Sequence, residues 1–124
     1  MWLCLPDSFL SIVDKAVSPQ CLCVRARRRE HILAVFPGAA VQDTPGNDYP
    51  FRAEIFRPEV ARVIAERVLD IDYANHKEAT RDEGLHSAYS AVWGVMRRLE
   101  GPRKPARAAL RGRNPQRGLF DLAG

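Results

Sequence analysis

The side chains best suited to acid–base or metal chemistry gather in one stretch of the chain. They are Asp70, Asp72, His76, Asp82, Glu83 and His86. Nucleases and hydrolases use such groups to bind metal ions or to transfer protons. The stretch has none of the spacings that mark these enzymes: no H-E-x-x-H, no G-x-S-x-G, no P-loop and no glycine-rich dinucleotide fingerprint. We therefore predict no catalytic residues, place Asp82 or Glu83 at the start of the last helix, and keep a small metal-dependent hydrolase or nuclease as an alternative.

Cys4, Cys21 and Cys23 are the other candidates for metal binding, with His31 as a fourth ligand. Cys21 and Cys23 would point the same way along a strand, but C-x-C is not the C-x₂-C pair of zinc sites and no second pair exists. We therefore predict no metal and no cofactor. An odd number of cysteines suits free thiols in a reducing compartment.

The sequence favours a cytoplasmic protein. Its first residues have neither the basic start nor the length of a signal peptide. No apolar run approaches the roughly 20 residues that a membrane span needs. We therefore expect no membrane interaction, and the composition leaves the oligomeric state open.

Positive charge is concentrated at the C-terminal end. Residues 1–100 hold 13 Lys and Arg against 14 Asp and Glu, a net charge of −1, whereas residues 101–124 hold six against one, a net charge of +5. Basic tails of this kind contact nucleic-acid phosphates without reading sequence, and a purely solubilising tail is the alternative. The residues predicted to make such contacts are Arg103, Lys104, Arg107, Arg111 and Arg113.

A second basic set belongs to the predicted sheet. Arg25, Arg27 and Arg52 fall on one face by strand alternation, with Glu54 among them. Phe56 is the one aromatic residue that the pattern places there as a stacking platform for a base. We therefore predict an ordinary solvent-facing surface.

The end of the tail carries the sharpest motif. Gln116-Arg117-Gly118-Leu119-Phe120 resembles the Gln-x-x-Leu-Phe peptide with which many bacterial polymerases and repair proteins dock on the DNA sliding clamp. The resemblance implies that Gln116, Leu119 and Phe120 bind the partner, and Leu122 extends the apolar segment. Arg117 and Gly118 depart from the residues preferred between the fixed positions. Docking on another partner, or folding back onto the chain's own surface, remains open.

The elements that must position these groups are predicted from periodicity. Alternation and turn residues predict strands over 9–13, 21–27, 40–42 and 49–56. Apolar residues at three- and four-residue steps predict helices over 29–36, 58–71 and 85–99, with residues 72–83 irregular between the last two. The ββαββαα order predicts an α+β fold, with a four-stranded, mostly antiparallel sheet and about three helices.

This pattern predicts that the chain has two parts, a domain and a tail. Residues 1–101 are predicted to form a compact domain, and Gly101-Pro102 to end its last helix. Residues 102–124 are predicted to be a flexible basic tail, since they are too poor in apolar side chains to offset the entropy of ordering.

Short segments of the domain carry a second resemblance. They include Met1-Trp2-Leu3, Phe9-Leu10-Ser11-Ile12-Val13, Ile71-Asp72-Tyr73 and Leu85-His86-x-Ala88-Tyr89 with Val92-Trp93. In these segments the chain resembles a family of small proteins from bacterial genomes and their phages, over about residues 1–100. That family has no established activity, so the resemblance implies a bacterial or prophage setting and no catalytic residues.

These observations predict a non-catalytic adaptor or regulator that docks on a protein partner, the sliding clamp, through its C-terminal peptide. The alternative from another class is a phage- or mobile-element-encoded inhibitor of a host complex, similar in kind to an anti-CRISPR protein. A truncation after Gly101 separates the two, because the adaptor loses its function and the inhibitor keeps it.

Overall fold

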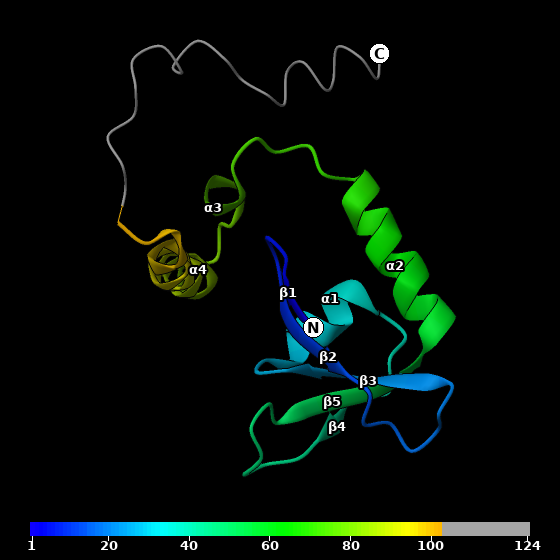
Figure 1. Cartoon of the computed structure of the whole chain (residues 1–124). Coiled ribbons are helices and arrows are strands. Elements are labelled where there is room, and N and C mark those ends of the chain that lie inside the picture. The colour runs from blue at the N-terminus through cyan, green and yellow to red at the C-terminus, as the bar shows by residue number, and fades with distance from the viewer. Residues whose placement is uncertain (103–124) are drawn as a thin grey trace. The chain divides into compact units, whose positions relative to one another are not determined.

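The computed structural model describes residues 1–102. The chain divides into two units, Met1–Gly94 and Val95–Gly124, and each is described by itself. Within the described residues there are five strands and four α-helices (Figure 1). The predicted α+β class and antiparallel sheet are confirmed, whereas the predicted numbers of four strands and three helices are both one too low.

The strands form a single antiparallel sheet in the order β1-β2-β3-β5-β4. They are β1 (Trp2–Cys4), β2 (Phe9–Val13), β3 (Cys21–Ala26), β4 (Gln42–Asp43) and β5 (Phe51–Phe56). The central pair, β3 and β5, is the longest, and the two edges are the shortest strands.

One face of the sheet is the core face. Ile12 pairs with Val24 and Val24 pairs with Ala53, so that apolar side chains from three strands line up across the sheet. Leu10 and Val24 are fully buried, and Ala53 is 2% exposed. The alternation predicted for these strands is therefore confirmed, because residues two apart along a strand share a face.

Helices α1 (Arg29–Val35) and α2 (Arg57–Leu69) cover this core face, and Figure 1 shows both on the same side of the sheet. Ile32 of α1 and Val60 of α2 belong to the same buried cluster as the strand residues. Pro58 stands in the first turn of α2, where its missing N–H breaks no hydrogen bond. The opposite face of the sheet is left for polar and aromatic side chains.

Two short elements escape the sequence analysis, β1 and α3 (His76–Ala79). β1 has three residues and exists because it pairs with β2, with Trp2 opposite Ser11. α3 is a single turn capped by Asn75, whose Oδ1 accepts hydrogen bonds from two backbone N–H groups. Neither element is long enough to show a period. The short strand β4 begins two residues later than predicted.

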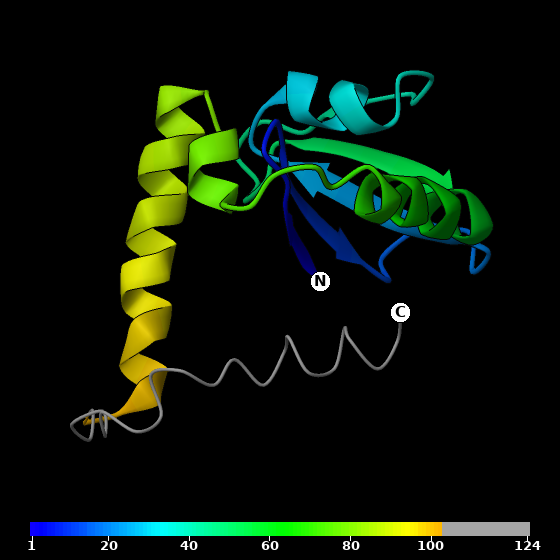
Figure 2. The ribbon, with the colours of Figure 1, turned by 90° about the horizontal axis from the view of Figure 1, so that it is seen from above.

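Helix α4 (Glu83–Met96), the long yellow helix in Figure 2, begins where the acids predict it. Oδ1 of Asp82 accepts a hydrogen bond of 2.8 Å from the backbone N–H of Leu85, which satisfies one of the open donors of the first turn. A 3₁₀ turn, Arg97–Glu100, follows the helix, and Gly101 ends it with a φ of 68°. The predicted stop at Gly101 is therefore confirmed.

Candidate functional site

The outer face of the sheet carries a row of large side chains that cross it from strand to strand. Trp2 of β1 lies opposite Ser11 of β2, Ser11 lies opposite Arg25 of β3, and Arg25 lies opposite Arg52 of β5. Residues that are directly opposite share a face and touch. Nη2 of Arg25 accordingly donates a 2.7 Å hydrogen bond to Oγ of Ser11. Arg25 and Arg52 thus share one face, as predicted.

Tyr49 lies beside this row in an unusual backbone conformation. Its φ of 56° is in the left-handed region, which a tyrosine rarely adopts. Arg52 holds this turn, because Nε and Nη2 donate to the carbonyl oxygens of Tyr49 and Asp48 at 3.3 Å and 2.9 Å. The Tyr49 ring is buried beneath two cations, with Cζ of Arg25 at 4.7 Å and Cζ of Arg27 at 4.4 Å from the ring centroid.

Aromatic rings continue from this cluster toward the edge of the sheet. The ring centroids of Tyr49 and Phe9 are 6.4 Å apart, and those of Phe9 and Trp2 are 5.9 Å apart in an edge-to-face contact. The sequence pattern indicates Phe56 alone as an aromatic platform and does not indicate these three. For Phe9, strand alternation does predict this position, because Phe9 precedes the buried Leu10 and adjacent residues of a strand face opposite sides of the sheet.

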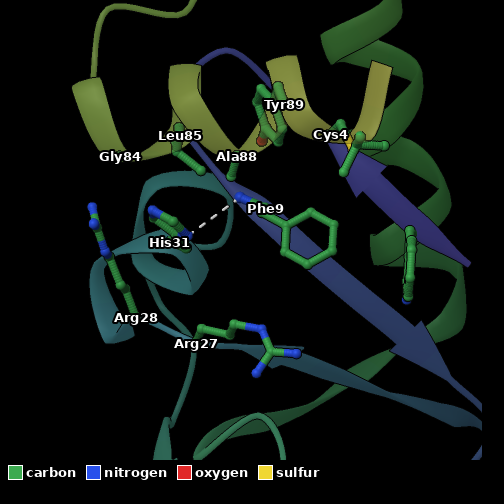
Figure 3. A pocket seen from close by; sticks show the side chains of 11 residues that line it. Cys4, Phe9, Arg27, Arg28, His31, Gly84, Leu85, Ala88 and Tyr89 are labelled. Carbon is green, nitrogen blue, oxygen red and sulfur yellow. Dashed lines mark hydrogen bonds between the residues drawn. The ribbon is translucent and has the colours of Figure 1, made fainter. Parts of the chain in front are cut away.

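A pocket of about 240 Å³ opens between this face and helix α4. Figure 3 shows its two walls, one from the strands and one from the first turns of α4, with the β3–α1 junction closing one side. The side chains that line it are Trp2, Cys4, Phe9, Arg27, Arg28, His31, Leu85, Ala88, Tyr89 and Val92, together with Gly84. The lining is mainly apolar, with two arginines at one side.

The two arginines are positioned by acidic partners. Nη1 of Arg27 lies 2.9 Å from Asp48, and Nη1 of Arg28 lies 3.2 Å from Asp82. A Cβ at Gly84 would lie 2.8 Å from Nη2 of Arg28, so glycine leaves room there for the guanidinium. The hydrogen bond from the α4 backbone, ahead of the charge of Arg28, holds the pKa of Asp82 below its usual value. All four charged side chains are about half or more exposed, so neither ion pair is shielded from solvent.

Two buried polar residues fix the walls of the pocket. Nδ1 of His31 accepts a 3.3 Å hydrogen bond from the backbone N–H of Phe9. Burial, followed by the charge of Arg28, lowers the pKa of His31 below 6.5, so the imidazole is neutral. The Tyr89 hydroxyl lies 2.8 Å from the carbonyl oxygens of Leu5 and Ser8, and this contact ties α4 to the turn between β1 and β2.

The two histidines of the stretch from 70 to 86 make contacts within the fold. The His76 ring lies between Tyr73 and Tyr89, at centroid distances of 6.0 Å and 5.1 Å. Nδ1 of His86 lies 2.9 Å from the carbonyl oxygen of Lys77. These contacts hold α3 between its neighbours in the chain. Among the described residues, no group of three or more His, Cys, Asp or Glu side chains could hold a metal ion.

The three cysteines are free thiols, two on β3 and one on β1. Cys23 is buried on β3, opposite Glu54 of β5, while Cys4 is exposed on the edge strand. Burial raises the pKa of Cys4 and of Cys23, so both thiols stay protonated at neutral pH. Nδ1 of His31, considered above as a fourth ligand, accepts a hydrogen bond from the backbone of β2.

The predicted docking and phosphate-contacting residues lie outside the described residues. They are Gln116, Leu119, Phe120 and Leu122, and Arg103, Lys104, Arg107, Arg111 and Arg113. In the part of the chain that the structure describes, no helix is long and apolar enough to cross a membrane.

Comparison with known proteins adds no relative. No protein-family model matches the chain, and neither a curated protein nor a solved structure matches it significantly. The motif in the tail and the geometry of the domain are therefore the observations that bear on function.

Proposed function

We propose that this protein is a non-catalytic adaptor that docks on the bacterial DNA sliding clamp through its C-terminal peptide. The observation that carries the proposal is the pattern Gln116-x-x-Leu119-Phe120 at the end of a basic segment. Between Gly101 and this peptide, Leu110 is the only large apolar residue. A peptide whose apolar side chains stand apart from their surroundings suits a docking role.

The chemistry of the peptide fits such docking. Leu119 and Phe120 fill an apolar cleft, while the Gln116 amide forms hydrogen bonds at the rim of that cleft. Leu122 adds apolar area two residues further on. The basic residues before the peptide face the DNA that the clamp encircles, where each arginine can replace a counterion on a phosphate.

The end of the last helix supports a separation between the folded domain and the peptide that docks on the partner. Helix α4 and its 3₁₀ extension end at Glu100, and the φ of Gly101 turns the backbone out of the helical path. The 14 residues between Gly101 and Gln116 can span at most about 48 Å when extended. That reach lets the peptide bind a partner while the domain stays outside the binding cleft.

The test is calorimetric titration of the full chain into a purified bacterial sliding clamp. We expect micromolar binding that Phe120→Ala weakens at least about tenfold, since burial of a phenyl side chain supplies a few kcal/mol. Leu110→Ala, which removes a side chain of similar size from the same segment, is the matched control and should leave Kd unchanged. Absence of binding, or equal binding by the Phe120→Ala variant, would refute the proposal.

The resemblance of residues 1–100 to small bacterial and phage proteins keeps one other function in view, inhibition of a host complex by the folded surface. Removal of residues 102–124 distinguishes it. An inhibitor keeps its activity without the tail, whereas the adaptor loses the clamp.

A further inference from the structure

We propose that the pocket between the outer face of the sheet and α4 binds an unpaired base of a single-stranded nucleic acid. In this proposal Trp2 stacks on the base, and Arg27 and Arg28 contact the phosphates beside it. The inference goes beyond clamp docking, because it assigns a ligand to the folded domain and uses none of the residues of the C-terminal peptide.

The aromatic side of the argument is the exposure of Trp2. Its side chain is 66% exposed, although it belongs to a strand and lines the pocket. Phe9 supports it from one side by the edge-to-face contact, and Tyr49 supports Phe9 in turn. An exposed indole on a rigid sheet is a sequence-tolerant platform, since every base has a flat face to stack on it.

The size of the pocket selects a single ring system. Its volume of about 240 Å³ is below the roughly 300–1,000 Å³ of pockets for drug-sized molecules. Leu85, Ala88 and Val92 of α4 make its apolar wall, against which the apolar face of a flat heterocycle can pack. Entry of one base requires that the base be unpaired, because a base in a duplex is already stacked and paired.

The charge beside the pocket complements a phosphate backbone. Arg27 and Arg28 follow one another in sequence and both line the pocket. The contact of Arg27 with the Tyr49 ring fixes its guanidinium, while its partner Asp48 is a side chain 72% exposed. Exposed pairs of this kind contribute little to stability, so phosphate oxygens can displace the carboxylates and accept the same hydrogen bonds.

The decisive measurement uses tryptophan fluorescence. The chain has two tryptophans, Trp2 and Trp93, so Trp93→Phe leaves Trp2 as the reporter and keeps a ring beside Lys77. We expect a thymidine oligonucleotide of about 12 residues to quench Trp2, and the quenching to persist at about 300 mM salt, where the contacts of the basic tail are weakened. A duplex of the same length should bind at low salt without quenching Trp2.

Variants of the full chain then assign the contact, with binding followed by the anisotropy of a labelled oligonucleotide at the higher salt. Trp2→Ala should raise Kd about tenfold and Trp2→Phe should restore most of the affinity, as expected for stacking. Arg28→Gln should reduce the dependence on salt by about one phosphate contact. Leu69→Ala, which changes another exposed apolar side chain, 84% exposed on α2, is the matched control and should bind like the parent.

The remaining arms name the source of the base and the results that overturn the proposal. Equal quenching by RNA of the same sequence supports the proposal and extends the ligand to both nucleic acids. Quenching by a mononucleotide without quenching by the oligonucleotide overturns it in favour of a small-molecule site. Quenching by the duplex, or unchanged affinity of Trp2→Ala, also overturns it. Clamp binding by these variants should be unaffected, so the two proposals fail separately.

Discussion

The contact between the Tyr89 hydroxyl and the turn between β1 and β2 gives the most direct test of the structure. Tyr89 comes from α4, and its hydroxyl lies 2.8 Å from the carbonyl oxygens of Leu5 and Ser8, more than eighty residues earlier in the chain. One hydroxyl hydrogen serves one carbonyl at a time. We therefore predict that Tyr89→Phe, which keeps the ring and removes this donor, loosens the attachment of α4.

The expected loss can be worked from the remaining partners of each carbonyl. The oxygen of Ser8 keeps a 2.8 Å hydrogen bond from the N–H of Leu5, but the oxygen of Leu5 keeps a single long bond of 3.4 Å. One hydrogen bond is lost, and the half-buried carbonyl oxygen of Leu5 is left poorly satisfied. Together these cost about 1–2 kcal/mol in the free energy of unfolding.

Urea denaturation followed by circular dichroism measures this change, with Tyr73→Phe as the control. Tyr73 is half-buried, so its variant should lose less than about 0.5 kcal/mol. Burial also raises the pKa of Tyr89 above 10.0, so the unfolded chain ionises first and stability should fall as the pH rises above about 10. Tyr89→Phe should remove that alkaline loss. Equal stability of the two variants would refute the described contact.

Two further predictions concern titratable groups of the unit Met1–Gly94. Burial raises the pKa of Asp7, but the hydrogen bonds from Arg67 and Ser8 outweigh it and hold that pKa below 3.8. Arg67→Met should therefore cost about 1 kcal/mol at neutral pH in urea denaturation, and the difference should shrink as the pH falls below 3.8, where the parent loses the contact with Asp7 but keeps the hydrogen bond from Arg67 to the Ala34 carbonyl oxygen. His31 is neutral in the fold and gains a proton on unfolding below pH 6.5, so the melting temperature should fall as the pH drops through that value. His31→Gln should flatten this slope, and an unchanged slope would contradict the buried neutral ring.

The elements that could be predicted from sequence are those whose side chains repeat with a clear period. Apolar residues two apart in β2, β3 and β5 share the core face, and the predicted core positions such as Leu10 and Val24 are fully buried. The periodic pattern starts at Leu85, two residues inside α4, and the acids before it indicate the true start, because Asp82 caps the helix through a local hydrogen bond. Strand alternation and helix capping are both local patterns that involve residues only a few positions apart in the sequence.

The candidate site could not be predicted in the same way, because it is assembled from distant segments. Trp2 looks like an ordinary terminal residue until β1 pairs with β2. Tyr49 was assigned to a strand, but its φ of 56° and the bonds from Arg52 place it in a turn under two guanidinium groups. The residues of α4 that line the pocket come more than eighty residues after Trp2. No pattern within a single segment of the sequence predicts that these two parts of the chain lie together.

The shortness of the two edge strands has a consequence for how this protein meets other chains. β1 has three residues and β4 has two, so neither edge offers more than a fragment of unpaired backbone. A long flat edge can recruit a foreign strand and start cross-β aggregation, and short edges remove that template. A protein with an indole exposed on its edge strand is thereby kept from polymerising through its backbone, and any partner of the sheet has to recognise its side chains.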